Sequence, residues 1–197
     1  MAMLASILLA AAPALAEFER LAAALKAAPA WQARFSQAYI PEGFPAATSE
    51  GGRLTLAAPA RLRFDYDNGG RAFAVDGGVA RFVDPAGPSC DAVRLDQGTW
   101  GRLPLAAVLD PAAAEAAFTI EGTGTSLRLV PKQPTPDLAQ VHLQLDAAGM
   151  IGTLEVVDQA GTVNRFLFSE WKRSPAPGEE FFRPSLPGGS PCTPGAQ

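Results

Sequence analysis

The 197-residue chain contains one histidine, His142, as a potential acid–base catalyst. A Ser-His-Asp or Cys-His site would have to use it as the base. His142 lies between Val141 and Leu143 in a stretch where apolar and polar residues alternate, which places it on the polar side of a strand. The sequence also lacks the nucleophile-elbow, phosphate-loop and zinc-protease motifs. We therefore expect a solvated histidine and a protein that is not an enzyme.

A second stretch that could form a functional site runs from Asp65 to Gly70, with Asp76 beyond it. Its acidic residues echo the spacing of a calcium loop, but Gly69 stands where a ligand is needed and Asp76 where a bidentate glutamate is usual. The dipeptide Asn68-Gly69 is instead a preferred hairpin turn. We interpret the stretch as a turn and expect neither a metal nor a cofactor.

The charge balance argues against nucleic acid as a partner. Lys and Arg number 16 against 20 Asp and Glu, which gives a formal net charge of −4, and the basic residues are scattered singly. Proteins that bind phosphate backbones gather basic residues on one surface. We expect no nucleic-acid binding.

Residues 1–16 form a short apolar run that ends in Ala14-Leu15-Ala16 and is followed by Glu17. An apolar run with small residues at its end is typical of a secretory signal peptide. We expect cleavage after Ala16 and export of the protein. The alternative interpretation is a short buried helix.

Export affects how the two cysteines, Cys90 and Cys192, are interpreted. An oxidising compartment allows them to form a disulfide, which would attach the Pro- and Gly-rich end of the chain to the body of the protein. Spacing in the sequence does not show that two residues are close in space, so the alternative of two free thiols stays open.

The pattern of apolar residues divides the chain into one early helix and a long series of strands. Helical spacing at residues 17–26 predicts an amphipathic helix that ends before Pro29. From residue 31 onward, alternating segments separated by turn residues predict antiparallel hairpins. Helices are expected at 103–109 and 111–117. The expected strands are 31–40, 52–57, 60–67, 71–76, 79–84, 118–121, 126–130, 140–146, 151–158 and 162–171.

About ten to eleven strands with two or three helices predict an α+β protein. We expect one domain over residues 17–187 and a flexible tail over residues 188–197. An antiparallel sheet of this size must curve strongly, because twisted sheets rarely stay flat. Its inner face is then either filled by its own side chains or left as an apolar cavity, and the pattern alone does not decide between the two.

Several motifs follow one another in a characteristic order: residues 31–37, 52–56, 59–66, 75–85 and 118–131, and late strands that end near Phe181. In this order and spacing the chain resembles the outer-membrane lipoprotein carrier family of the Gram-negative periplasm, the LolA type. The resemblance covers nearly all of the chain after residue 16. It implies an incomplete antiparallel barrel closed by a helical lid over an apolar cavity.

The resemblance also implies a function. The protein would be a periplasmic monomer that takes acylated lipoproteins from an inner-membrane ABC exporter and delivers them to an outer-membrane acceptor. An acyl chain of about sixteen carbons gains on the order of 12 kcal/mol on leaving water, at ~0.8 kcal/mol per CH₂, so acylated cargo needs a cover to cross an aqueous space. Another envelope lipid such as a glycolipid is the alternative cargo, and an enzyme is a more remote one.

Alternation on the strands predicts which residues line the inner face. The family's aromatic residue at the cavity mouth corresponds to Leu62, and the family's lid-latching Arg corresponds to Ala58, which has no donor to offer. Arg53 or Arg61 could replace that latch. The candidate lipid-binding residues are Leu62, Phe64, Tyr66, Phe73, Val75, Phe82, Leu154, Val156, Phe166 and Phe168.

Overall fold

The computed structural model describes residues 11–45, 48–95, 104–189 and 192–194. Its helices are α1 (Ala11–Lys26), α3 (Pro104–Leu109), α4 (Pro111–Ala117) and the short 3-10 helix η1 (Glu179–Phe182). Its strands are β1 (Ala30–Ile40), β2 (Thr48–Ala57), β3 (Arg61–Tyr66), β4 (Ala72–Asp76), β5 (Val79–Asp84), β6 (Ser89–Arg94), β7 (Phe118–Thr123), β8 (Ser126–Pro131), β9 (Gln140–Leu145), β10 (Ile151–Val157) and β11 (Val163–Ser174).

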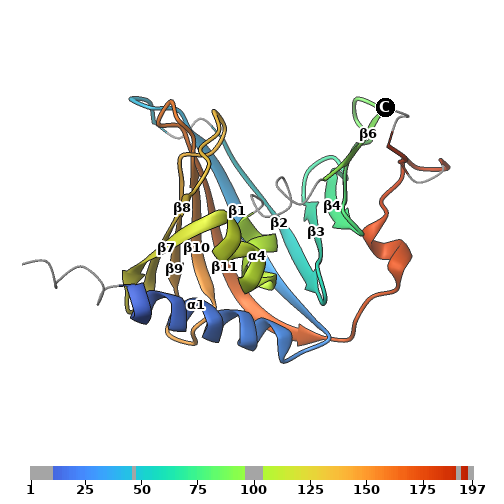
Figure 1. Cartoon of the computed structure of the whole chain (residues 1–197). Helices are drawn as coiled ribbons and strands as arrows, with labels where there is room; N and C mark the ends of the chain where they lie inside the picture. The colour runs from blue at the N-terminus through green and yellow to red at the C-terminus, as the bar shows by residue number, and fades with distance from the viewer. Residues whose placement is uncertain (1–10, 46–47, 96–103, 190–191, 195–197) are drawn as a thin grey trace, which may run out of the picture.

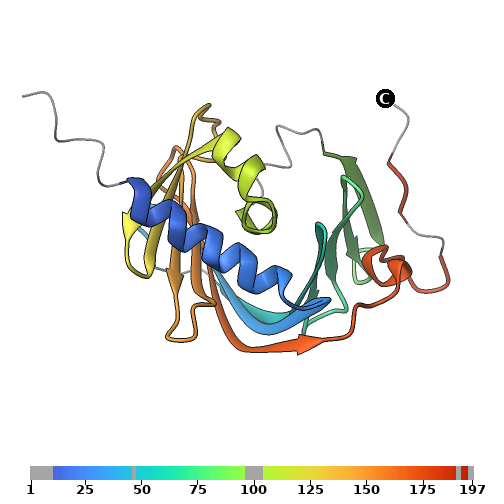
Figure 2. The ribbon, with the colours of Figure 1, turned by 60° about the horizontal axis from the view of Figure 1, so that its bottom comes forward.

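The strands form one antiparallel sheet in the order β6-β5-β4-β3-β2-β1-β11-β10-β9-β8-β7. Within β1–β6 and within β7–β11 consecutive strands pair as hairpins, and β1 joins the two halves because it pairs with both β2 and β11. The sheet curves into a U whose edges, β6 and β7, do not pair with each other (Figures 1 and 2). The predicted α+β class and incomplete barrel are confirmed.

Strand β6 was absent from the strands expected from the sequence. It follows a Pro- and Gly-rich stretch, and its own residues carry little alternation, so the sequence gives no strand signal there. The strand forms because it pairs with β5, from Arg94 opposite Val79 to Ser89 opposite Asp84. Tertiary pairing, rather than local pattern, therefore sets this edge of the sheet.

Helix α1 lies across the inside of the U (Figure 2). Phe18, Leu21 and Leu25, spaced by three and four residues, are buried against the sheet and the other helices. The helix begins at Ala11 and continues through Ala16, where we predicted signal-peptide cleavage. Residues 1–10 of that predicted signal peptide lie outside the described residues. Within the described ranges, no helix has the length and apolar content that a bilayer crossing requires.

Helices α3 and α4 also lie within the curve of the sheet (Figure 2). Asp110 separates them and caps α4, since its side chain accepts a hydrogen bond from the Ala113 N–H at 3.2 Å. At the other end, Lys132 Nζ donates to the Glu115 carbonyl at 2.5 Å and attaches α4 to β8. Both predicted helices are present, although residue 103, the expected start of the first, lies outside the described residues.

The hydrophobic core fills the space between these helices and the concave face. Apolar side chains of α1, α3 and α4 form one cluster with inward-facing residues of the sheet. Within the described residues, Thr55 is the only polar or charged residue that is fully buried. The concave face is thus an apolar surface covered by helices over part of its extent.

After β11 the chain crosses to the outer, convex face, where residues 178–186 form what we call the outer strap. Phe182 is fully buried there against Ala30 and Ala57. The guanidinium of Arg61 lies 5.1 Å from the Phe182 ring centroid, and Arg63 Nη1 donates to the Phe181 carbonyl at 2.6 Å. Small alanines on the outside of the strands give the strap room to pack.

Beyond η1, Arg183 Nε donates to Asp76 Oδ2 at 2.8 Å. Cys192 is buried, its carbonyl accepts from Arg81 Nε at 3.0 Å, and it forms a disulfide with Cys90 on β6 with a Cα–Cα distance of 5.6 Å. Cys192 is therefore anchored, although it lies within residues 188–197, for which the sequence predicted a flexible tail. Residues 190–191 and 195–197 lie outside the described residues.

The disulfide generates a stability prediction. Replacing Cys90 and Cys192 by Ser should lower the free energy of unfolding by about 2–5 kcal/mol, because the bridge closes a long loop and restricts the unfolded chain. The two cysteines are 102 residues apart. Urea unfolding of the oxidised protein and of the double variant measures the difference. Reduced wild-type protein should match the variant, and equal stability of the oxidised protein and the variant would contradict the prediction.

Candidate functional site

Alternation along the strands places one set of side chains on the concave face. Two rows of neighbouring residues cross this face from the centre of the sheet to the β6 edge. In the row Leu56, Leu62, Val75, Ala80 and Val93, the exposed fraction rises from 1% at Leu56 to 56% at Val93. This row is therefore buried near the centre and exposed at Val93, whereas the second row ends at the exposed Asp91 on β6.

The ten residues predicted to line the face divide into three groups. Those buried in the core cluster are Leu62, Phe64, Val75, Leu154 and Phe168. Those partly buried against the same cluster are Tyr66, Phe73, Val156 and Phe166. Phe82 is half-buried and lies opposite Phe73 on the same face. The structure brings all ten to the concave side, and their contact with lipid remains a proposal.

Aromatic rings dominate the centre of the face. Phe35 and Phe64 meet edge to face with their centroids 5.1 Å apart, and Phe64 and Phe166 lie 5.6 Å apart. Phe166 and Phe168 are parallel at 6.0 Å. The sequence analysis did not include Phe35 among the lining residues, although it has the same alternation within 31–40 as the residues that were chosen. These contacts make a continuous aromatic surface across β11, β1 and β3.

Gly52 permits this aromatic contact. It faces inward on β2, between Phe35 on β1 and Tyr66 on β3. A Cβ atom at position 52 would lie 2.1 Å from the Asp65 carbonyl oxygen and 2.5 Å from Phe35 Cε1, closer than any real contact allows. Because Gly52 has no side chain, Phe35 and Tyr66 approach across β2 to a centroid separation of 5.4 Å.

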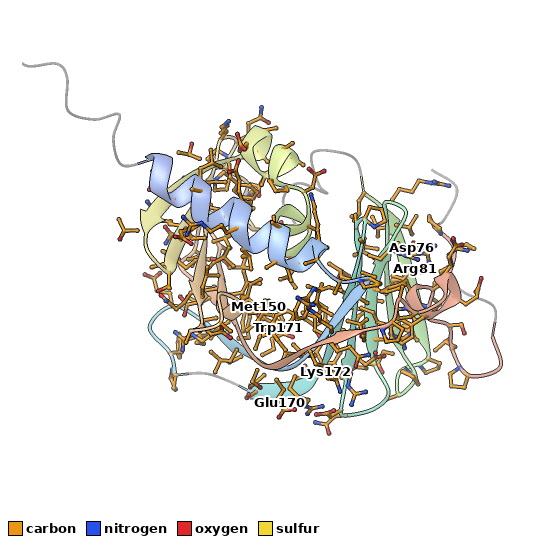
Figure 3. All side chains as sticks on the ribbon, turned by 90° about the horizontal axis from the view of Figure 1, so that it is seen from below. Asp76, Arg81, Met150, Glu170, Trp171 and Lys172 are labelled. Carbon is orange, nitrogen blue, oxygen red and sulfur yellow. A yellow bond between two sulfur atoms is a disulfide. The ribbon has the colours of Figure 1, made fainter. Side chains whose placement is uncertain are left out.

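A bulge in β11 adds one more aromatic residue to the face. Between the pairs Gln32–Lys172 and Arg34–Ser169, β11 has one residue more than β1, and Glu170 there adopts a φ of 57°. The extra residue turns Trp171 inward, where its Nε1–H donates to the Ile151 carbonyl at 2.8 Å. Figure 3 shows Trp171 beside Met150 within the curve of the sheet.

The aromatic surface ends at a polar rim near the β1–β2 hairpin. Tyr66 Oη donates to Gln37 Oε1 at 2.9 Å, and Gln37 Nε2 donates to Asn164 Oδ1 at 3.0 Å. Arg71 forms an ion pair with Glu50 and lies 4.9 Å from the Tyr66 ring centroid. Burial of Tyr66, with a smaller contribution from the Glu50 charge, raises the pKa of its hydroxyl above the ordinary value.

The residues expected at the cavity mouth and in the latch of the helical lid lie elsewhere in the structure. Leu62, expected at the mouth, is only 2% exposed and belongs to the core. Arg61 packs on Phe182 at the outer face, and Arg53 pairs in register with Asp65 on that same face. Neither arginine therefore replaces the family's lid-latching Arg. Ala58 is exposed, and its carbonyl accepts a hydrogen bond from Arg61 Nη2 at 3.2 Å.

The other chemical candidates from the sequence lie away from this face. His142 lies on β9 between Arg128 and Glu155, facing outward because its neighbours Val141 and Leu143 are buried. Residues 67–70 connect β3 and β4 in a hairpin, and Asp67 Oδ2 accepts from Arg34 Nη2 at 2.6 Å. Within the described ranges, no group of three or more His, Cys, Asp or Glu residues is arranged to hold a metal ion.

The fold and the site together define a structural class: an open antiparallel half-barrel with helices over an apolar concave face. Residues 26–185 match the sequence model of a family described as "Outer membrane lipoprotein carrier protein LolA". The match spans most of the chain, and the protein belongs to this family. Proteins of the family are carriers that bind lipoproteins rather than enzymes.

Individual relatives agree with the family match. A protein of Methylococcus capsulatus named outer-membrane lipoprotein carrier protein is 30% identical over 176 residues, which is 86% of this chain and 84% of that protein. A protein of Xanthomonas oryzae with the same name is 26% identical over 156 residues, covering 76% of this chain and 75% of its own length.

Solved structures share the fold at low identity. An uncharacterized conserved protein of Thermus thermophilus superposes with a TM-score of 0.51 at 13% identity, covering 85% of this chain and 90% of its own. A lipoprotein-sorting protein domain of Vibrio parahaemolyticus gives a TM-score of 0.50 at 10% identity, covering 87% and 97%. At these identities the likeness shows the fold alone.

The close approach at Gly52 predicts a sharp contrast between neighbouring glycines. Gly52→Ala should lower the free energy of unfolding by about 1–3 kcal/mol, because the new methyl group forces the Asp65 carbonyl and the Phe35 ring away. Gly51→Ala on the outer face is the control, since its Cβ would meet the movable Asp67 side chain at 3.3 Å. Urea unfolding measures both. Equal effects of the two substitutions would contradict the packing argument.

The raised pKa of Tyr66 predicts a pH dependence of stability. The folded state holds the hydroxyl proton more tightly than the unfolded chain, so this stabilisation is present below about pH 10 and is lost as the pH rises through the raised pKa. The difference in unfolding free energy between wild type and Tyr66→Phe should therefore change above about pH 10. Urea unfolding across that range measures it, and a constant difference would contradict the prediction.

Proposed function

We propose that this protein is a periplasmic carrier that binds the acyl chains of lipoproteins on its concave face and carries them from the inner to the outer membrane. The observation that carries the proposal is the continuous apolar face, sealed by helices at its centre and open at the β6 edge. Family membership supports a lipoprotein cargo. In this cycle an inner-membrane ABC exporter loads the carrier as a monomer, and an outer-membrane acceptor unloads it.

The burial pattern supports entry of acyl chains from the β6 edge. There, Val93 exposes 56% of its surface on the same side of the sheet as the buried Leu62 and Val75. A chain that enters at Val93 continues along an unbroken apolar row into the core. Each methylene that leaves water contributes ~0.8 kcal/mol, so the row provides a steady gain in free energy toward the centre.

The helices supply the movable cover. In this structure α3 and α4 occupy part of the concave face, with Val108 and Leu109 buried in the cluster. They have 6 and 7 residues, which is too short for an isolated helix to be stable, so tertiary contacts hold them in place. We propose that acyl chains take over these apolar contacts as α3 and α4 move away from the sheet, and that the helices return after unloading.

The proposal predicts a specific loss of cargo. Val93→Glu should sharply reduce the acylated material that co-purifies with the protein from the native periplasm, because a carboxylate on the entry row resists desolvation. Organic extraction followed by mass spectrometry measures this material and identifies it as lipoprotein or as another envelope lipid such as a glycolipid. The fold should persist, since Val93 is already exposed.

Leu167→Glu is the matched control. Leu167 is 49% exposed, but it lies on the outer face of β11, between the inward-facing Phe166 and Phe168. Its substitution should leave the extracted material unchanged. Wild-type protein without any acylated material would contradict the carrier proposal, and equal losses in both variants would contradict entry along the concave face.

A further inference from the structure

Three polar side chains form a short hydrogen-bonded row at the end of the aromatic surface, and we call Gln37, Tyr66 and Asn164 the polar rung. Each lies two residues along its strand from an inward-facing phenylalanine, namely Phe35 on β1, Phe64 on β3 and Phe166 on β11. The side chains therefore point to the same side as the rings. All three are half-buried, so they border both the apolar interior and the solvent.

The hydrogen bonds of the rung leave three amide N–H donors without a partner among the described residues, beside the remaining lone pairs of its oxygens. Tyr66 gives its only proton to Gln37 Oε1, and Gln37 Nε2 gives one proton to Asn164 Oδ1. In the part of the chain that the structure describes, the second Gln37 N–H and both protons of Asn164 Nδ2 have no protein acceptor. A ligand with acceptor oxygens can therefore complete the rung by accepting from these three N–H groups.

The electrostatics of the rim favour a neutral acceptor. Arg71, the cation beside the rung, is paired with Glu50 and lies against the Tyr66 ring. Its charge is thereby balanced within the protein, and the free donors belong to uncharged amides. A phosphate or free carboxylate would gain no charge-assisted hydrogen bond from these amides, whereas ester and amide carbonyl oxygens match neutral amide donors.

We propose that the polar rung binds the ester or amide carbonyl oxygens at the head of acylated cargo, so that the acyl chains extend over Phe35, Phe64 and Phe166. This inference rests on the proposed function and adds a positioning device to it. The rung recognises the linkage that acyl chains share, and the aromatic surface accepts their methylenes. The apolar face then contacts the methylenes along the length of each acyl chain, and the rung fixes the position of the carbonyl groups at the rim.

The test compares two ligands that differ only in their carbonyl groups. Dipalmitoylglycerol carries two ester carbonyls, and dihexadecylglycerol, its diether analogue, carries none. Displacement of a hydrophobic fluorescent dye from lipid-stripped protein gives the affinity for each. We expect wild type to prefer the diester by at least about fivefold, the factor that one net hydrogen bond contributes.

The double variant Gln37→Leu with Asn164→Leu should lose this preference while it keeps its affinity for the diether. The diether measurement shows whether the variant still folds with an intact apolar face. Gln32→Leu is the control, because Gln32 lies on the same strand but on its outer face, opposite Thr55. That control should retain the wild-type preference for the diester.

The outcomes separate the inference from the proposed function. Equal diester preference in wild type and in the double variant would overturn the role of the rung, even if both ligands bind. Failure of wild type to bind either ligand would instead contradict lipid carriage itself. The same affinity measurement with a triacylated peptide and with dipalmitoylphosphatidylglycerol shows whether the carbonyls belong to a lipoprotein or to a phospholipid. The double variant should lower the affinity for whichever of the two is the natural cargo. A variant that lowers neither affinity overturns the proposal.

Discussion

The structure depends on covering one apolar face of a sheet that does not close. A curved antiparallel sheet with an apolar inner side must bury that side, and among the described residues no second sheet packs against it. Helices α1, α3 and α4 of the same chain provide the cover. They protect the central strands and leave the β6 side of the face open to solvent. The fold therefore combines a sealed core with a neighbouring apolar surface that can receive a ligand.

Much of this architecture could be predicted from alternation, because a period of two fixes which side of a strand each residue occupies. The inward direction of Phe64, Phe73 and Val75 followed from this rule alone. Trp171 did not, since the bulge at Glu170 changes the period within β11. The polar rung could not be predicted either, because its hydrogen bonds join residues 29 and 127 positions apart. Such contacts depend on strand order and register, which a local pattern does not encode.

The balance between cover and cargo explains why a carrier of this kind needs weak local elements. A tightly bound lid would compete too well with acyl chains for the concave face. Helices α3 and α4 are short, and tertiary contacts rather than intrinsic helix stability hold them. Acyl chains and helix side chains present similar apolar surface to the sheet. In the proposed carrier cycle, exchange between them would therefore need only a small difference in free energy, which would favour both loading and release.

The outer strap has a mechanical consequence for the shape of the sheet. It follows the convex side beyond β11 and contacts β3 and β4, and Cys192, further along the chain, is joined to Cys90 on β6 by a disulfide. When a curved sheet rolls up further, distances along its convex surface become longer. The attachments of the chain to β3, β4 and β6 on the convex side oppose this lengthening and so limit how far the sheet can roll. The wing formed by β3 to β6 is thus restrained from the convex side, opposite the concave face that we propose binds lipid.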